Sequence, residues 1–418
     1  MSFDDFNRKM SIYFNNQYDL EQLIISTIQS KDDLEENFVN IFNYIIEKKI
    51  KENKEDLLLL IKLLLSLSNN YQRSENFFPI IENIFIFCKK EMQEFFNNVD
   101  IFNICKTNKR ILLFLFENGY IIPDHSIFDI INHEQDPFQN YSSYFSLEFK
   151  DFVIEDKSEQ NHEMFDIDLF NQKRKLGQND SHICEIIRND LVNDFSLYIQ
   201  NNNYSLTSFI PFSIFETNSF LLNKKPTLIE YSAFVGSFNI FQYLYNHNVA
   251  LQSTIWNYAI HSQNFEIIRF LEKNGIKPTS YEKCFVESIK CHYHDLFLYF
   301  QKYLNITENQ SYFFIKCLKY YNFICLKEFD DFLLNFYRSC VSNSAKQDVV
   351  FEILLQLCNF DYIKFAELSL SAIENSMKNQ LNIKKKLPYQ NQSNNISDCY
   401  LKILNICLFQ NQIISNLE

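Results

Sequence analysis

An internal repeat of 27 to 29 residues constrains this chain more than any other feature. Four similar stretches begin at Thr227, Thr254, Lys283 and Tyr312, so that successive starts are 27, 29 and 29 residues apart. Such a repeat is typical of a solenoid, in which each unit cannot bury its apolar face alone and therefore stacks on its neighbours. We expect a row of similar units over residues 226–340.

Equivalent positions of the four stretches also share side-chain size. The bulky column is Ile229, Trp256, Phe285 and Phe314, and the small column, three residues later, is Ser232, Ala259, Ser288 and Cys317. Two further columns are Ile240, Ile267, Leu296 and Cys325, and then Leu244, Leu271, Phe300 and Phe329. The pattern predicts helix pairs in which the small residue lets the next unit approach, while the large residues fill the space between units.

These columns resemble the ankyrin repeat, whose Thr-Pro-Leu-His, Ala-Ala, Gly-His-Leu-Glu-Ile-Val, Leu-Leu and Gly-Ala runs align with 227–249 and 254–276. Gly236 falls on the glycine in the middle of that repeat, and Gly275 falls on the glycine that ends its second helix. Asn248 holds the same place one repeat earlier, and Asn118-Gly119 matches Asn274-Gly275. Three of the four glycines in the chain therefore occupy ankyrin glycine positions.

The wider chain resembles a protist ankyrin-repeat family with an N-terminal helical domain of unknown function. The similar stretches are 175–190, 213–218, 226–231, 258–262 and 287–292. The resemblance implies an ankyrin-type helical array and protein–protein interaction. Because no catalytic constellation is found in the sequence, we expect a non-catalytic scaffold. Two departures matter. The period is shorter than the usual repeat of about 33 residues, so the hairpin fingers should be short or absent. The histidine of the opening helix is replaced, in turn, by Glu230, Asn257, Val286 and Ile315.

We therefore predict an all-α fold with an ankyrin-like solenoid preceded by an α-helical N-terminal block. The block covers 1–123, and apolar periodicity places its helices at Asp19–Gln29, Leu34–Lys48, Glu55–Ser68, Phe78–Lys89 and Glu91–Ile104. The predicted domains that follow are an acidic, partly disordered insertion (124–180), a helical transition unit (181–225), the repeats (226–340), and degenerate repeats or a C-terminal cap (341–418).

The insertion carries thirteen acidic residues against five basic ones. It is interpreted as a solvated loop rather than an acidic docking tail. An alternative hypothesis makes the protein an enzyme of unrecognised type that uses carboxylates of this segment, such as Asp166 and Asp168.

Composition excludes several other classes. Four glycines and seven prolines are too few for a sandwich, barrel or propeller, and no phosphate-binding glycine loop exists. The formal charge of −13 argues against nucleic-acid binding, and no stretch is apolar enough to cross a membrane. The eleven cysteines are expected as reduced, buried thiols. We expect a cytoplasmic protein, with the nucleus left open; Lys384-Lys385-Lys386 is more typical of a solvated loop than of an import signal.

No catalytic, cofactor or metal site is predicted. The best metal pattern is Cys291-His292-Tyr293-His294 with Cys284. Adjacent helical residues point about 100° apart, so Cys291 and His292 should not share one ion. His133-Glu134 and His162-Glu163 lack the second histidine of a helical zinc motif.

The predicted partner is another protein. In stacked ankyrin helix pairs the opening helices line a concave face, and the residues just after the small column point into it. Here those residues are Phe234, Val235, His261, Ser262, Lys290, Cys291, Lys319 and Tyr320. The row becomes basic at its lysine end, which favours an acidic or amphipathic partner segment. A competing interpretation packs Phe234 and Val235 on the preceding unit around 209–222.

Overall fold

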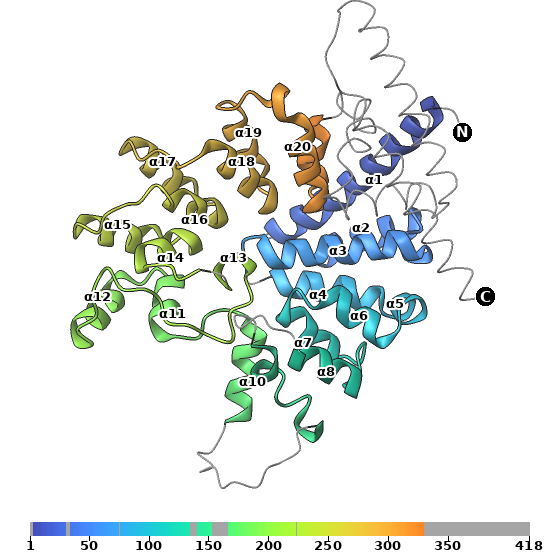
Figure 1. Ribbon diagram of the computed structural model, residues 1–418, viewed down its shortest axis with the longest axis horizontal. Coiled ribbons are helices and arrows are strands. Elements are labelled where there is room, and N and C mark those ends of the chain that lie inside the picture. The colour runs from blue at the N-terminus through green and yellow to red at the C-terminus, as the bar shows by residue number, and fades with distance from the viewer. Residues whose placement is uncertain are drawn as a thin grey trace, which may run out of the picture. The chain divides into compact units, whose positions relative to one another are not determined.

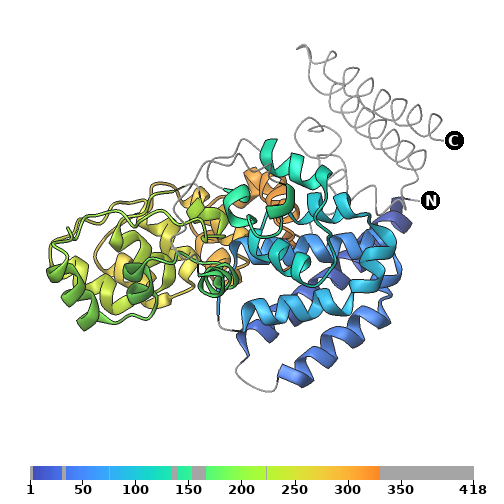
Figure 2. The ribbon, with the colours of Figure 1, turned by 90° about the horizontal axis from the view of Figure 1, so that it is seen from below.

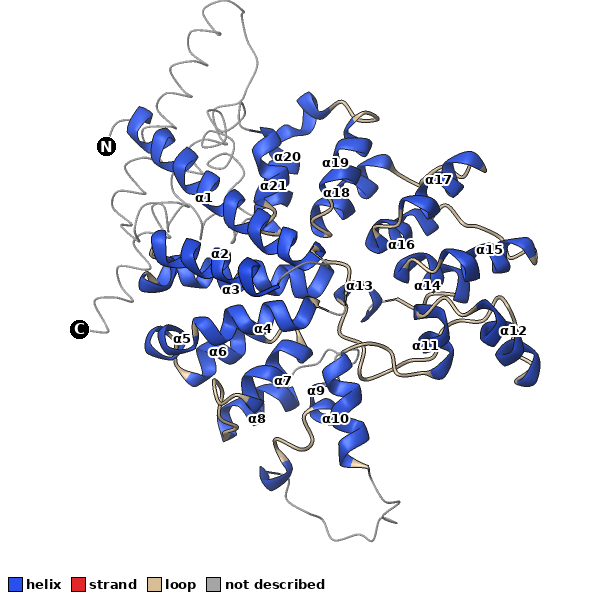
Figure 3. Cartoon of the chain, turned by 180° about the vertical axis from the view of Figure 1, so that it is seen from behind, coloured by secondary structure: helices blue, strands red, loops and turns tan. Residues whose placement is uncertain are grey.

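A computed structural model of the chain describes residues 3–30, 34–74, 76–133, 140–152, 166–222 and 224–329. Every regular element in these ranges is a helix, apart from one isolated antiparallel bridge between Phe209 and Thr227 (Figure 3). The all-α fold class is therefore confirmed for the described part of the chain. The predicted C-terminal cap at 341–418, with the lysine run at 384–386, lies outside the described residues.

The N-terminal helices, with η for 3-10 helices, are α1 (Phe3–Gln29), α2 (Leu34–Glu47), η1 (Ile50–Glu52), α3 (Lys54–Asn70), α4 (Phe77–Phe87), α5 (Lys89–Phe95), α6 (Asn98–Cys105) and α7 (Lys109–Glu117). They are followed by α8 (His125–His133), α9 (Tyr141–Tyr144), η2 (Lys150–Phe152), α10 (Ile167–Leu176), α11 (His182–Arg188), α12 (Val192–Asn201) and α13 (Ser219–Leu222). The remaining helices are α14 (Leu228–Val235), α15 (Phe238–Asn246), α16 (Ile255–Ser262), α17 (Phe265–Lys273), α18 (Tyr281–Lys290), α19 (His294–Gln301), α20 (Ile306–Lys319), α21 (Phe323–Leu326) and η3 (Lys327–Phe329).

The chain divides into two compact units, one of residues 23–304 and one that joins residues 1–22 to residues 305–418. The first three repeat stretches fall in the larger unit and the fourth falls in the other. Within the larger unit, α2 to α7 form one group of helices and α11 to α17 form another (Figures 1 and 2).

The five helices predicted for the first hundred residues are present, with three differences. The first was predicted to begin at Asp19, but α1 begins at Phe3. The last of them is interrupted, because Asn97 begins α6 with a capping box in which its side chain accepts from the backbone N–H of Asp100 and the Asp100 carboxylate accepts from Asn97 N–H. Pro79, expected at a break, lies in the first turn of α4, where a missing N–H leaves no helical bond unmade.

The repeats in the larger unit are helix pairs. The opening helices α11, α14, α16 and α18 pack on one another in sequence, and each is followed by a second helix, α12, α15, α17 and α19 (Figure 1). All members of the predicted bulky and small columns are buried, with Ser232, Ala259 and Ser288 fully enclosed. The two serine hydroxyls donate to carbonyls of their own helices, Ile229 O at 2.9 Å and Phe285 O at 2.7 Å. The size pattern of the sequence therefore describes core positions.

The turn inside each pair repeats one backbone conformation. Asp190, Gly236, Gln263 and His292 all have positive φ, between 51° and 87°. In two pairs the following N–H closes the opening helix by donating to the small-column carbonyl, from Ser237 to Ser232 O (2.9 Å) and from Tyr293 to Ser288 O (3.0 Å). Every unit needs a residue in the left-handed backbone conformation at this point, but only at Gly236 does the residue type indicate it.

The acidic segment 124–180 is not the solvated loop that its charge suggested, wherever the structure describes it. It contributes α8, α9, η2 and α10, and Tyr144 and Phe145 are fully buried. Arg174 in α10 is 2% exposed, and its Nη1 donates to Tyr144 O at 3.0 Å and to Glu148 Oε2 at 2.7 Å. Aromatic burial outweighed the surplus of charge here, since each buried charge found a partner. Residues 134–139 and 153–165 are outside the described ranges.

In the smaller unit, the part of α1 that precedes residue 23 packs against the fourth repeat stretch. The Glu21 carboxylate is buried and accepts from the backbone N–H groups of Phe323 (2.6 Å) and Ile324 (3.0 Å) at the start of α21. The Lys327 ammonium lies 3.9 Å from the centre of the Tyr18 ring. A carboxylate from the N-terminal helix thus supplies the cap that α21 needs.

Two expectations on cellular context can be compared with the described residues. The seven cysteines among them are buried and form no disulfide, as predicted for reduced thiols. None of the described helices combines the length and the apolar character that a bilayer crossing requires.

Replacing Trp256 tests whether the bulky column carries the repeat core. Its side chain is 2% exposed, and its Nε1–H donates to Ile276 O at 2.8 Å. We expect Trp256→Ala to lower the free energy of unfolding by about 3–5 kcal/mol, and Trp256→Phe, which keeps a ring and loses the donor, by about 1–2 kcal/mol. Urea unfolding followed by circular dichroism measures both. An alanine variant as stable as the wild type would place the indole outside the core.

Candidate functional site

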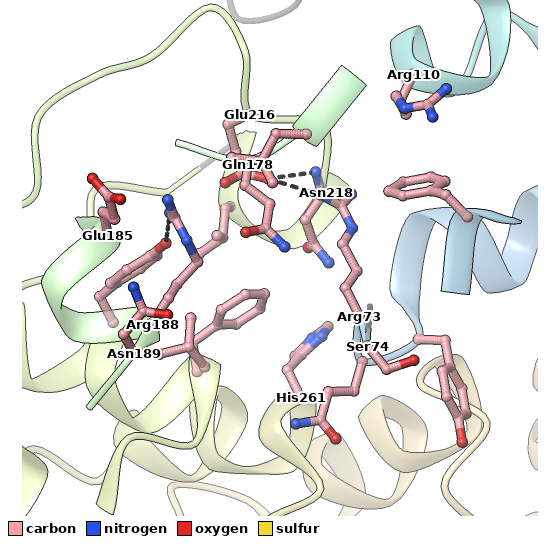
Figure 4. Close-up of a pocket in the computed structure, with 18 of the residues that line it drawn as sticks. Arg73, Ser74, Arg110, Gln178, Glu185, Arg188, Asn189, Glu216, Asn218 and His261 are labelled. Carbon is pink, nitrogen blue, oxygen red and sulfur yellow. Dashed lines mark hydrogen bonds and ion pairs between the residues drawn. The ribbon is translucent and has the colours of Figure 1, made fainter. Parts of the chain in front are cut away.

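A pocket of about 530 Å³ lies within the larger unit, in the size range of ligand sites. Its walls come from the loop after α3, the first turn of α4, α7, the end of α10, α11, the segment before and within α13, α14 and α16. Figure 4 shows Arg73, Arg188, Gln178 and His261 arranged around one space, each from a different segment. The pocket is where the helix pairs meet the N-terminal group of helices.

Arg73 and Glu216 form the buried ionic centre of this pocket. Their side chains are 8% and 9% exposed, with Nη1 and Oε1 3.8 Å apart. Arg73 Nη2 donates to Thr217 Oγ1 at 2.7 Å, and Nη1 donates to Gly177 O. Burial lowers the pKa of the Arg73 guanidinium, and the charge of Glu216 opposes that shift. Arginine still keeps its charge near neutral pH, so the pair remains ionic.

The Glu216 carboxylate also organises the backbone around it. Oε1 accepts from the N–H groups of Thr217 (2.9 Å) and Asn218 (2.7 Å), and Oε2 accepts from Asn179 N–H at 3.2 Å. The two stretches 175–190 and 213–218, which carry part of the family resemblance, are thereby joined at the pocket. Ser213 Oγ, donating to Asp180 Oδ1 at 2.8 Å, adds a second link between them.

Two other arginines border the same space. Arg188 Nη1 donates to Asn179 O at 2.7 Å and to the Tyr231 hydroxyl at 3.0 Å (Figure 4). Arg110 pairs with Glu82, whose Oε1 lies 2.5 Å from Nη2, and lies 4.9 Å from the Phe78 ring centre. The guanidinium of Arg73 lies 5.3 Å from the same ring. The cationic groups are thus held by carbonyl and aromatic contacts as well as by carboxylates.

A cluster of three rings lies at the side of the pocket formed by α14 and α16, where Phe234 and His261 line it and Phe220 packs behind them. The Phe220 and Phe234 rings are stacked with centres 5.8 Å apart, and the His261 ring lies 4.2 Å and 5.3 Å from them, respectively. Phe234 therefore packs on the preceding 209–222 segment, as the competing interpretation expected, and it also lines the pocket.

His261, Glu287 and Cys291 bring three metal-type ligand atoms within 4.8 Å of one another. The two imidazole nitrogens face different partners, with Nε2 2.7 Å from Glu287 Oε1 and Nδ1 3.4 Å from Cys291 Sγ. A single imidazole nitrogen therefore cannot bind an ion that Glu287 and Cys291 also bind. In addition, Lys290 Nζ contacts the same Glu287 oxygen at 3.2 Å. These contacts fit a hydrogen-bonded chain better than a tetrahedral ion.

This hydrogen-bonded series runs from the thiol of Cys291 through the imidazole of His261 to the carboxylate of Glu287, which is the order of groups in a nucleophilic triad. Cys291 is fully buried, and burial raises the pKa of its thiol well above the ordinary value. A substrate therefore has no path to this sulfur in the described structure, and the thiol stays protonated. The chain fixes the His261 ring at the pocket wall.

The predicted partner-binding residues have different fates. Phe234, Val235 and His261 line the pocket together. Ser262 is buried, with its Oγ accepting from the N–H of Asn264, the N-cap residue of α17, at 3.1 Å, and Cys291 is buried as described above. These two do not face a partner as predicted, because each completes a hydrogen bond inside the stack.

The lysine end of the predicted row is also changed. The Lys290 side chain is 19% exposed and contacts Glu287, so it is not the outward lysine that was expected. Lys319 is exposed and Tyr320 half-buried at the end of α20, in the other unit, where the ammonium lies 5.6 Å from the Tyr320 ring centre. His292 Nε2 faces Ser66 Oγ at 3.1 Å, whereas Cys291 faces His261, so the two neighbours point to different partners as predicted.

Sequence reasoning missed the arginines and Glu216. The chain has seven arginines among its 39 basic residues, and three of the seven line this pocket. Since arginine suits planar, multidentate contacts better than lysine does, its scarcity was a usable signal. Of the two carboxylates suggested for an enzyme, Asp166 caps α10, with Oδ1 accepting from Leu169 N–H at 2.9 Å, and Asp168 is exposed in the first turn of the same helix.

Gly177 allows the pocket segments to approach. Its φ is +63°, and an added Cβ would lie 3.1 Å from Thr217 Oγ1 and 3.3 Å from Arg110 Cβ. Gly275 has φ +68° with no atom within 4 Å of an added Cβ. We expect Gly275→Ala to cost about 1–2 kcal/mol for the backbone alone and Gly177→Ala to cost about 1–3 kcal/mol more. Equal losses in urea unfolding would show that the space around Gly177 is not tight.

The contacts of Glu287 with His261 and Lys290 should make the stability of the fold depend on pH. Burial alone would raise the pKa of Glu287, but hydrogen bonds and charges from His261 and Lys290 lower it to about 2. Because the pKa of this carboxyl group is lower in the folded protein than its ordinary value of 4.5, its ionised form stabilises the fold at pH values above 4.5. This contribution is lost as pH falls towards 2. We expect Glu287→Gln to cost roughly 2–3 kcal/mol at pH 7, with the difference narrowing below pH 4.5.

Burial also lowers the pKa of His261, although Glu287 opposes this shift. Protonation of His261 therefore destabilises the fold as pH drops below 6.5, in the wild type and in the Glu287→Gln variant. Urea unfolding between pH 7 and pH 3 measures the difference. Glu282→Gln, an exposed change on the same helix, is the control and should cost less than about 0.5 kcal/mol. A wild-type advantage that stays constant across this range would contradict the prediction.

Comparison with protein-family models, with curated proteins and with solved structures finds no match for this chain. The resemblance to ankyrin repeats therefore rests on the residues of the sequence and on the helix pairs described above.

Proposed function

We propose that the protein is a non-catalytic scaffold for protein–protein interaction, built on ankyrin-like helix pairs. The observation that carries this proposal is the pocket whose wall includes the opening helices α11, α14 and α16. Three residues from the row predicted for partner contact, Phe234, Val235 and His261, line it together. A stack of helix pairs presents successive opening helices along one face, which suits an extended partner segment.

The chemistry of the pocket supports binding more than catalysis. The thiol of its Cys–His–Glu chain is enclosed, and the carboxylate of Glu216 is occupied by backbone N–H groups. Neither group is placed to transfer a proton to a bound molecule. What remains open to the pocket is an aromatic wall and a set of guanidinium groups, which are the side chains most enriched at protein interfaces.

Affinity capture with a pocket variant tests this function. Val235 is half-buried at the end of α14 and lines the pocket, while Leu197 is 56% exposed on α12 and is not part of it. We expect protein partners recovered from native lysate on the wild-type chain to be lost on Val235→Asp and retained on Leu197→Asp, because only the former puts a charge into the pocket. Mass spectrometry identifies the recovered proteins.

The melting temperatures of both variants need to stay near that of the wild type for this comparison. A milder pair, Val235→Thr and Leu197→Thr, replaces the aspartates if Val235→Asp fails to fold. Recovery of the same proteins on wild type and pocket variant would contradict the proposed binding face, and recovery of none on the wild type would contradict the scaffold function.

A further inference from the structure

We propose that the pocket binds an oxyanion carried by a peptide segment, and that Arg188 and Arg73 are its cationic ligands. The inference rests on the proposed scaffold function and names the chemistry that the partner segment presents. It follows from the charges that the pocket leaves uncompensated, from the free donors of these two side chains, and from the apolar wall beside them.

Arg188 carries the uncompensated charge. Among the described residues, its hydrogen bonds use only Nη1, which donates to Asn179 O and to the Tyr231 hydroxyl. No carboxylate of the described residues lies within 4.0 Å of this guanidinium. Its Nε and Nη2 are therefore available donors on a half-buried side chain at the pocket wall (Figure 4).

The other charged groups of the pocket are accounted for. Arg110 pairs with Glu82 at 2.5 Å and Lys175 pairs with Glu117 at 3.2 Å, so both cations are compensated outside the pocket lining. The remaining lining carboxylate is Glu185, which is exposed and lies 3.4 Å from His182 Nδ1. Among the described residues, Arg188 is thus the lining cation that forms no ion pair with a carboxylate.

Arg73 supplies a second, deeper donor. Its side chain is 8% exposed, and its Nε is buried without a hydrogen-bond partner in the described structure. A buried unmade hydrogen bond costs about 1–3 kcal/mol, which a bound oxygen atom would recover. The ionic contact with Glu216 is long, at 3.8 Å, and the Glu216 oxygens already accept from three backbone N–H groups.

The apolar wall points to a peptide rather than a bare anion. Phe78, Leu221, Tyr231, Phe234 and Val235 line the same space as the two guanidinium groups. An oxyanion bound by Arg188 would therefore lie near room for an apolar side chain. Guanidinium forks bind carboxylate and phosphate groups alike, so the oxyanion has three sources: an acidic side chain, a C-terminal carboxylate or a phosphorylated residue.

Four short peptides distinguish these sources when titrated into the full chain by isothermal calorimetry. The probes are acetyl-Leu-Phe with a free carboxylate, acetyl-Leu-Phe-amide, acetyl-Leu-Glu-Phe-amide and acetyl-Leu-phosphoserine-Phe-amide. We expect at least one anionic peptide to bind ten-fold or more tightly than the neutral amide, with affinity falling as salt rises. The tightest of the three identifies the source. Equal affinity for all four peptides would overturn the proposal.

Arginine variants test the assigned ligands. Arg188→Gln should weaken binding of the preferred peptide at least ten-fold, while Arg269→Gln, an exposed arginine on α17, should leave it unchanged. Arg188→Lys keeps the charge without the fork, should give an intermediate affinity, and replaces Arg188→Gln if that variant does not fold. Equal affinity of the Arg188 and Arg269 variants would overturn the assignment.

Failure of this inference is distinguishable from failure of the scaffold function. If Arg188→Gln still captures the protein partners that Val235→Asp loses, and no anionic peptide is preferred, the oxyanion site is wrong while the binding face stands. If neither variant changes a capture seen with the wild type, the binding face itself is wrong.

Discussion

The close approach of the opening helices is the constraint on which the larger unit depends. α14, α16 and α18 meet at Ser232, Ala259 and Ser288, and none of these side chains is exposed. A larger residue at any of them would push the helices apart or force neighbouring side chains out of their rotamers. Because the serine hydroxyls donate within their own helices, these polar residues occupy the interface without an unmade hydrogen bond.

A buried polar network holds the repeats to the N-terminal helices of the same unit. Gly177 O accepts from Arg73 and from Thr217 Oγ1, while Glu216 accepts from Asn179, Thr217 and Asn218. Taking a guanidinium and a carboxylate out of water is unfavourable unless further hydrogen bonds replace the lost solvation. The network supplies most of these hydrogen bonds and leaves the Nε of Arg73, a residue of the pocket wall, as the exception.

Apolar periodicity located the helices of the first hundred residues, because amphipathic spacing reports which face is buried whatever that face packs against. The high charge of 124–180 led to the wrong prediction of a solvated loop. Formal charge does not show whether a charged side chain has a partner close by in space, as Arg174 has in Glu148. The same limit applies to His292 and Gln263, whose positive φ is imposed by the turn and not by their own preferences.

By itself, the sequence determined the helix pairs, their register and the identity of their core columns. These follow from side-chain size and spacing within about 30 residues, over which helical geometry is nearly fixed. Only the tertiary structure determined where the pocket lies and which residues line it. Arg73 meets Thr217 and Ser66 meets His292 across 144 and 226 residues, and Cys291 turns inward to His261 instead of outward to a partner. Contacts at such separations depend on how the units stack, and no local pattern of residues encodes that.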